Sequence, residues 1–410
     1  MINSSKITVF TTFYMLVLAL IPGVVVDEFL NVPGTARVGT LLACVLFLIG
    51  LHLGAKLVRL EPPAFAPGLS NGSNDAGLIV LGLALLGVTA YVIAFGPVSP
   101  IIAAASGYDV LEVALLREDA VKLNTDPVFV RVYANTRDIL APAVFVLALE
   151  SLIRSPSRFA MRLFLLLLLF TAMFIGVWSG QKATLINYFV ASMIFLTRNA
   201  ARLMRLMLIS SPLLAAVIYA IFLVTYSGSF DEAEQFGDAA ENVLQGVIHR
   251  LFVGPFEVSM AYVDAADNQN LIDPVTSIPI IGAMLRPSPT TIENLIGVHY
   301  FFTGIDSISA NALCFAYAYI LGGYAFCLVM GVLTIVGLTL AVRMVRTAGN
   351  AFIDRAFQAM VAYRLLDLLN GNALSYLFGL FEWAIVAWVL ARFVSGLAQI
   401  RPPIAVGPFR

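Results

Sequence analysis

The chain has 410 residues, of which 60% are hydrophobic and 12% charged, with a formal net charge of −1. A soluble domain cannot bury so much apolar surface, so the composition indicates an integral membrane protein. No basic tract suggests a nucleic-acid partner. Cys44, Cys314 and Cys327 all lie in apolar stretches without C-x-x-C spacing, and we expect buried free thiols rather than a disulfide or a metal site.

Apolar runs of membrane-spanning length predict an all-α polytopic membrane protein with one integral domain, residues 1–410. The first run, from Ile7 to Val26, lacks a small-residue cleavage site, so we interpret it as a retained transmembrane helix and not a signal peptide. The length criterion gives about ten spans. In chain order they are 7–26, 38–58, 77–96, 138–153, 160–178, 183–198, 206–225, 323–343, 351–369 and 374–393.

Two long polar stretches, residues 97–137 and 226–308, interrupt these runs and hold most of the acidic residues. Just after the second stretch, the apolar segment Ala310–Tyr319 precedes Gly322 and Gly323, and we expect it to form a short re-entrant or interfacial helix.

Most basic residues lie in short connections that an even number of spans places on one side of the membrane. The positive-inside rule makes this side cytoplasmic, so both termini are predicted to be cytoplasmic and both polar stretches to face outward. The residues that decide this orientation are Lys6, Lys56, Arg59, Arg154, Arg158, Arg162, Arg198, Arg202, Arg205, Arg343, Arg346, Arg355, Arg392, Arg401 and Arg410.

Several cations on the outward side are candidates for binding a diphosphate, because guanidinium forks match phosphate oxygens. Lys182 begins the sixth span, where helix N-terminal amides would face the same anion; the alternative is a snorkelling interfacial lysine. Arg364 lies inside the ninth span, and the alternative for it is a self-neutralising pair with Asp367. The other candidates are Arg131 and Arg137 before the fourth span, and Arg250 and Arg286 in the large outer loop.

A general base is expected among the titratable side chains of the large outer loop. His299 is the first candidate, followed by Glu293 and His249, although a lone loop histidine is more often an ordinary surface residue. The chain has no D-x-D pair, H-E-x-x-H, G-x-S-x-G or phosphate-loop motif. These absences argue against a metal-dependent glycosyltransferase, a metalloprotease, a serine hydrolase and an ATP-driven pump.

Three segments resemble the bacterial oligosaccharide repeat-unit (O-antigen) polymerase family. The first is Ser179-Gly180-Gln181-Lys182-Ala183 at the start of an apolar helix, and the second is the loop opening around His249-Arg250-Leu251. The third runs from Arg286-Pro287-Ser288-Pro289 through Asn294–Tyr300 to Tyr317–Tyr324. Arg286 and Gly297 also have the Arg-x10-Gly spacing found in this family.

The resemblance implies a GT-C-like helical glycosyltransferase in the bacterial inner membrane, with two large periplasmic loops and neither a metal nor another cofactor. It would polymerise undecaprenyl-diphosphate-linked repeat units with inversion at the anomeric carbon, with a lipid-linked glycan as donor and another as acceptor. A chain-length regulator protein is a further implied partner. Lys182, Arg250, Arg286 and Arg364 would bind the diphosphate, His299 would be the base, and Tyr262 and Tyr300 would pack on sugars.

Two other functions remain open. An O-antigen ligase or another lipid-linked sugar transferase shares this architecture and would give nearly the same sequence signal. A transporter or flippase for a lipid-linked glycan belongs to a different class, and it should show inverted repeats and helices broken near the bilayer midplane.

Overall fold

The computed structural model describes residues 2–26, 29, 32–58, 71–96, 98–106, 116, 127–154, 159–178, 183–197, 199–210, 249–268, 292–301 and 312–400. These residues form helices and short connections, and none of them belongs to a β-strand. The all-α fold expected from the apolar runs is therefore confirmed over this part of the chain.

The helices are named in chain order, with η marking a π-helical turn. The first half contains α1 (Ser4–Met15), η1 (Leu16–Leu20), α2 (Ile21–Val25), α3 (Ala36–Leu57), α4 (Asn71–Phe95), α5 (Pro100–Ala105), α7 (Pro127–Asn135), η2 (Thr136–Leu140), α8 (Ala141–Ile153), α9 (Phe159–Val177) and α10 (Ala183–Leu196). The second half contains η5 (His249–Val253), α13 (Gly254–Asn268), α15 (Ile292–Phe301), α16 (Cys314–Arg346), α17 (Ala351–Leu369) and α18 (Ala373–Ile400).

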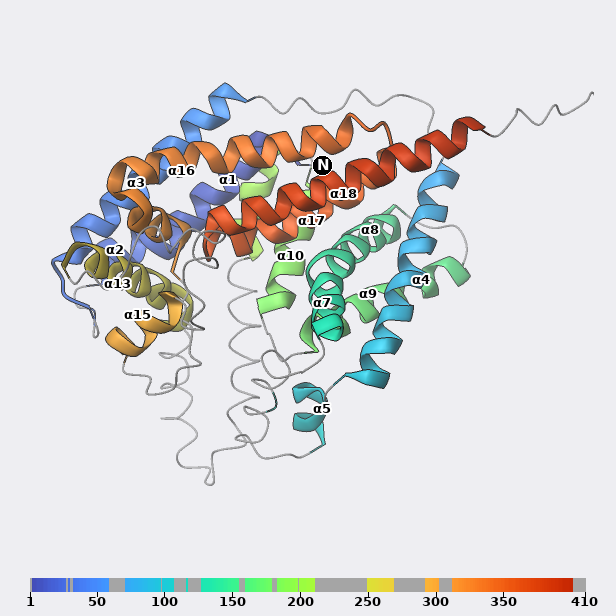
Figure 1. The fold of residues 1–410 in the computed structure, drawn as a ribbon, viewed down its shortest axis with the longest axis horizontal. Coiled ribbons are helices and arrows are strands. Elements are labelled where there is room, and N and C mark those ends of the chain that lie inside the picture. Colours follow the sequence, from blue (N-terminus) through green and yellow to red (C-terminus); the bar gives the residue numbers. More distant parts are fainter. Residues whose placement is uncertain are drawn as a thin grey trace, which may run out of the picture.

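The described helices pack in two groups that α17 connects. One group contains α3, α13, α16 and α18, and the other contains α4, α7, α8, α9 and α10. Helix α17 contacts α16 and α18 in the first group and α8 and α10 in the second. In Figure 1, α5 and α15, which come from the two polar stretches, lie on the side of the molecule opposite the C-terminal end of α18.

Six of the described helices are long and apolar enough to cross a membrane: Ser4–Val25, Ala36–Leu57, Asp75–Phe95, Phe159–Val177, Cys314–Arg346 and Ala373–Ser395. They coincide with six of the expected spans. The expected spans 138–153, 183–198 and 351–369 are also largely helical, in η2–α8, α10 and α17, but are shorter or carry more charges. The span 206–225 lies mostly outside the described residues, so the count of ten stays a prediction.

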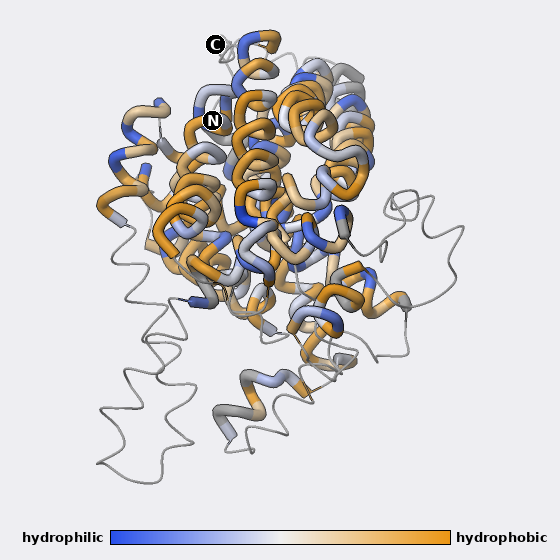
Figure 2. Tube along the Cα trace, turned by 90° about the vertical axis from the view of Figure 1, so that its left-hand side faces the viewer, coloured by the Kyte–Doolittle hydropathy of each residue, from blue (hydrophilic) through white to orange (hydrophobic). Residues whose placement is uncertain are grey.

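Large apolar side chains remain exposed along these helices, as a surface that faces lipid requires. Val38 is 73% exposed, Leu57 75% and Phe159 76%. Figure 2 shows that apolar residues occupy much of the length of the helices. Together with the six apolar helices, this surface identifies a multi-pass membrane protein.

Glycines allow α3 and α16 to approach backbone to backbone. A Cβ at Gly50 would collide with the carbonyl oxygen of Leu328, and a Cβ at Gly331 would collide with that of Phe47. Gly54, one turn after Gly50, packs against the backbone of α16 in the same way. In lipid, where burial of apolar surface does not drive association, such close packing of small residues stabilises helix pairs.

Each π-helical turn is followed by a proline at the second position of the next α-helix. These prolines are Pro22 after η1, Pro142 after η2 and Pro255 after η5. Proline lacks an N–H, and its ring clashes with the carbonyl four residues earlier, so the regular ladder is interrupted there. The chain compensates with wider bonds, from the N–H of Ile21 to the Leu16 carbonyl and from that of Ala141 to the Thr136 carbonyl.

Helix α16 is broken near its beginning by Gly322 and Gly323. Gly323 has φ 62° and ψ −153°, a backbone conformation that residues with a Cβ strongly avoid. The short helix expected before this glycine pair is present: it begins at Cys314 and is buried through Ile320.

Ion pairs connect the C-terminal ends of α8 and α16 with the N-terminal end of α17. Glu150 of α8 contacts Arg154 at 2.7 Å and also pairs with Arg355 of α17. Asp354, which follows the N-cap Asn350 of α17, lies 3.6 Å from Arg346 of α16. These pairs fix α8, α16 and α17 relative to one another at this end of the molecule.

We expect Gly50→Ala and Gly331→Ala each to lower the free energy of unfolding by about 1–3 kcal/mol, because the added methyl group meets a backbone that cannot move aside. Gly87→Ala and Gly379→Ala are the matched controls, since a Cβ at either position meets nothing within 4 Å. Thermal unfolding in detergent measures the effect. Equal midpoints for all four variants would contradict the close α3–α16 contact.

Candidate functional site

Four charged side chains meet between η2 and α17, and we call them the arginine–aspartate cluster: Arg137, Asp138, Arg364 and Asp367. Asp138 accepts from Arg137 Nε at 2.7 Å and from Arg364 Nη2 at 3.2 Å. Arg364 Nη1 donates to Asp367 at 3.1 Å, and the amide of Asn187 on α10 donates to the same carboxylate at 3.2 Å. The cluster therefore connects three helices through charged hydrogen bonds.

The π-helical turn η2 places two members of this cluster. Pro142 removes the N–H that would bond the Asp138 carbonyl in a regular α-helix, so the turn that contains Arg137 and Asp138 is wider than an α-helical one. On α17, Arg364 and Asp367 are three residues apart and share one face of the helix. They lie within two turns of its end at Asn370.

Aromatic rings surround the cluster. The Arg137 guanidinium lies 5.6 Å from the ring centre of Tyr133, and that of Arg364 lies 5.8 Å from Tyr376. At the end of α17, the hydroxyl of Tyr14 from α1 donates to the Asn370 side chain at 2.5 Å. Rings that hold cations in place and limit hydration strengthen the local electrostatic interactions.

The cluster is neutral in formal charge and only partly open. Its four side chains are between 14% and 27% exposed. Each guanidinium has five N–H donors, and the hydrogen bonds within the cluster use two of them on each arginine. An arriving anion has further donors to bind, and the carboxylates hold both guanidiniums in a fixed orientation.

The structure thus brings together two of the residues that we expected to bind a diphosphate, Arg137 and Arg364. It also forms the pair with Asp367 that was the alternative interpretation of Arg364. Arg131 is exposed on α7. Arg250 lies in η5 without a described side chain, and Lys182 and Arg286 lie outside the described residues.

The three candidate bases lie in η5 and α15. His249 Nε2 is 3.4 Å from the Glu257 carboxylate, whose side chain is 1% exposed. His299 is exposed on α15, and its ring packs edge-on against Tyr300 with the ring centres 4.9 Å apart. Glu293 belongs to the first turn of α15, and its side chain is outside the described set.

Tyrosine–aspartate pairs hold α13, α15 and the first part of α16 together. Tyr300 donates to Asp264 at 2.7 Å, and Tyr319 donates to Asp267 at 2.8 Å. Burial, together with the Asp264 carboxylate, raises the pKa of Tyr300 well above its ordinary value, so the phenol stays protonated and remains a donor.

Both tyrosines that were expected to pack on sugars are buried in this region. Tyr262 is 0% and Tyr300 5% exposed, and Tyr262 instead hydrogen-bonds Tyr317 at 3.2 Å. Each side chain therefore serves the packing of the protein in this structure. Asp267 is exposed, whereas Asp264 and Glu257 of the same helix are buried.

The three cysteines are buried free thiols, as expected. Among the residues that the structure describes, no three His, Cys, Asp or Glu side chains gather into a set that could hold a metal ion.

Asp138 and Asn187 are site residues that the sequence analysis missed. The available signal for Asp138 was local: an Arg–Asp pair directly before an apolar helix with a proline at its second position. Such a proline indicates an interrupted helix, and interruptions of this kind often occur at functional sites. No comparable sequence signal distinguishes Asn187.

We expect Asp138→Asn to lower the free energy of unfolding by about 3 kcal/mol, because two guanidiniums lose a charged partner in a poorly hydrated site. Asp367→Asn is the matched comparison and should cost less, since one guanidinium, that of Arg364, pairs with that carboxylate, and its other partner, the Asn187 amide, is neutral. Thermal unfolding of both variants in the same detergent measures the difference. A larger loss for Asp367→Asn would show that Asp138 is not the centre of the cluster.

Comparison of the chain with known protein families, with curated proteins and with solved structures finds no match. The function has to be inferred from the residues of this chain. Among the described residues, the side chains suited to binding or reacting with a substrate are those of the arginine–aspartate cluster and the exposed polar side chains of α13 and α15.

Proposed function

We propose that this protein polymerises lipid-diphosphate-linked oligosaccharide repeat units, as the bacterial O-antigen polymerases that it resembles do. Its substrates are an undecaprenyl-diphosphate-linked glycan donor and a second lipid-linked repeat unit as acceptor. The chain has ten spans in a GT-C-like arrangement in the bacterial inner membrane, both termini are cytoplasmic, and the chemistry takes place at the periplasmic face.

The observation that carries this proposal is the convergence of Arg137 and Arg364 on Asp138. Asp138 and Arg364 are 226 positions apart in the chain, yet they form a salt bridge at 3.2 Å, and Arg137 binds the same carboxylate at 2.7 Å. A charge inside a membrane helix is expensive, so such residues usually have a functional partner. Guanidiniums held at fixed orientation are suited to the oxygens of a diphosphate.

In the proposed reaction, a hydroxyl oxygen of the acceptor sugar forms a bond to the anomeric carbon of the donor. The bond from that carbon to the diphosphate oxygen breaks, and the leaving lipid diphosphate takes the electron pair. Arg137 and Arg364 stabilise its developing charge, which is commonly the largest contribution to catalysis. Lys182, Arg131, Arg250 and Arg286 are the further cations proposed to neutralise this group.

The proton of the acceptor hydroxyl passes to a base. His299 is the proposed base because it is exposed, whereas His249 already faces the Glu257 carboxylate. General-base catalysis of this kind contributes about 10²–10⁴-fold. Direct attack by the acceptor inverts the configuration at the anomeric carbon.

A transporter or flippase for a lipid-linked glycan is the second candidate, and the broken helix α16 favours it. Interrupted membrane helices often line transport sites, and the Gly322–Gly323 break exposes backbone next to a polar region. An O-antigen ligase is a third possibility within the same architecture. Deletion of the gene distinguishes a polymerase from the other two candidates. Loss of a polymerase leaves single repeats on the surface lipid, whereas loss of a flippase or of a ligase leaves none.

The double variant Arg364→Gln, Asp367→Asn tests the role of the cluster. It removes a neutral pair and leaves Asp138 with Arg137, so we expect the protein to fold. Loss of one preorganised donor to a developing charge costs about 10²–10³-fold in rate. In cells that depend on this gene, a gel of the surface polysaccharide should then show single repeats in place of long chains.

Arg154→Gln is the matched control, because Arg154 is 63% exposed at the other end of α8 and its partner Glu150 retains Arg355. It should leave the long chains unchanged. Normal polymer from a folded double variant would mean that Arg364 and Asp367 form only a structural pair.

A further inference from the structure

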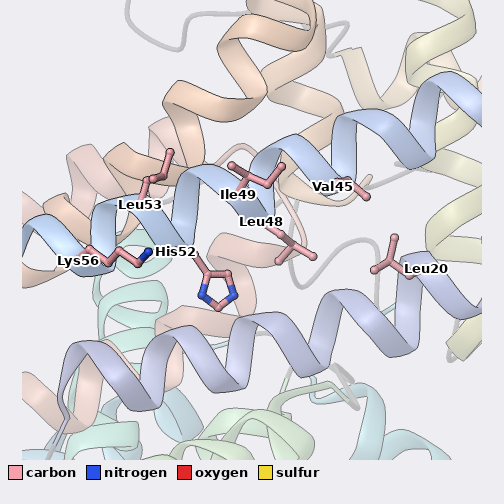
Figure 3. Close-up of a pocket in the computed structure, with 7 residues that line it drawn as sticks. All are labelled: Leu20, Val45, Leu48, Ile49, His52, Leu53 and Lys56. Carbon is pink, nitrogen blue, oxygen red and sulfur yellow. The ribbon is translucent and has the colours of Figure 1, made fainter.

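An open apolar groove runs along α3, beside η1. Its volume is about 440 Å³, and its walls are Leu20, Val45, Leu48, Ile49, His52, Leu53 and Lys56. Figure 3 shows His52 pointing toward α1, with Lys56 at one end of the groove and Leu20 near the other.

A hydrogen-bonding contact connects α1 to α3 beside the groove. The Thr12 hydroxyl of α1 lies 3.2 Å from Nε2 of His52 on α3, so the imidazole bridges the helices instead of facing lipid alone. The π-helical turn η1, which Pro22 imposes, forms the wall at the far end, where Leu20 lies. The groove is therefore built from fixed elements.

The environment and the length of the groove identify its occupant. Val45, Ile49 and Leu53 are 39–45% exposed on two helices that are long and apolar enough to cross a membrane, so a lipid chain is what fills the space between them. From Val45 to Lys56 the helix rises about 16 Å, at about 1.5 Å per residue. This is close to half of the roughly 30 Å hydrocarbon core, which is the depth of one leaflet.

Lys56 places a positive charge where the headgroup of such a lipid would lie. It is exposed in the last turn of α3, and the lining between it and Leu20 is apolar apart from His52. We propose that this groove binds one acyl chain of an anionic phospholipid, with the phosphate of its headgroup at the Lys56 ammonium. A zwitterionic lipid offers the same chain without the net charge.

The chain itself gives little selectivity, because lipid tails are as apolar in the bilayer as in the groove. The headgroup therefore determines the selectivity between lipids, and one lysine near the surface favours an anionic lipid about five-fold. No residue of the groove belongs to the arginine–aspartate cluster, so this proposal does not depend on the proposed enzymatic function.

Val45→Trp provides a reporter inside the groove. The full-length variant is placed in dioleoylphosphatidylcholine vesicles that contain a brominated-chain lipid, either phosphatidylglycerol or phosphatidylcholine. Bromine quenches a nearby indole, and subtraction of the same measurement on the unaltered protein removes the signal of the three native tryptophans. We expect brominated phosphatidylglycerol to reach half-maximal quenching at about one fifth of the mole fraction that brominated phosphatidylcholine needs.

Lys56→Gln in the reporter background should make the two lipids equal. Arg205→Gln is the matched control, because Arg205 is exposed on the helical segment 200–210, which does not line the groove, and it should leave the preference intact. Equal quenching by the two lipids in the reporter protein that retains Lys56 would overturn the proposal. An equal loss of preference in the Lys56→Gln and Arg205→Gln variants would also overturn it. If neither brominated lipid quenches the indole, no lipid chain enters the groove, and this result would overturn the proposal as well.

Discussion

The salt bridge between Asp138 and Arg364 is the interaction on which the arrangement of the polar centre depends. An arginine within an apolar helix bundle must find a counter-charge, because an unpaired ion in that environment is strongly destabilising. Asp138 supplies it from η2 while also binding Arg137. Since α17 contacts both groups of helices, this ion pair links η2 to an element that both groups share.

Neutrality of the cluster matters for the proposed reaction as well as for stability. Four charges of alternating sign attract one another, so the guanidiniums are oriented before any substrate arrives. A preorganised donor costs little reorganisation when charge develops on a leaving group, which is the condition for effective electrostatic catalysis. The same pairing lowers the local positive potential, and cations from the two polar stretches are needed to balance a full diphosphate.

Prolines and glycines give this bundle its irregular elements, and each irregularity lies at a polar or open feature. Pro142 follows the turn that contains Arg137 and Asp138, Pro22 follows the turn that contains Leu20 of the apolar groove, and Pro255 follows the turn that contains His249. The glycine pair in α16 similarly ends the buried helix that packs against α13. In a membrane, a regular helix satisfies its own backbone groups, so deviations persist only where the surrounding protein or a cavity compensates for them.

Hydrophobic length and glycine conformation are local properties, so the amino-acid sequence alone predicts the all-α membrane class, six of the spans, the buried thiols and a separate helix before Gly322–Gly323. It also identifies Arg364 as an unusual charge within an apolar run, and it includes Arg137 among several candidate cations that are unremarkable one by one. The packing of the helices shows that Asp138 joins these two arginines, that Tyr262 and Tyr300 are buried, and that η1 and α3 leave a groove open. These facts depend on which helices pack together over long separations in the chain, and the pattern of apolar residues along one helix does not specify its neighbour.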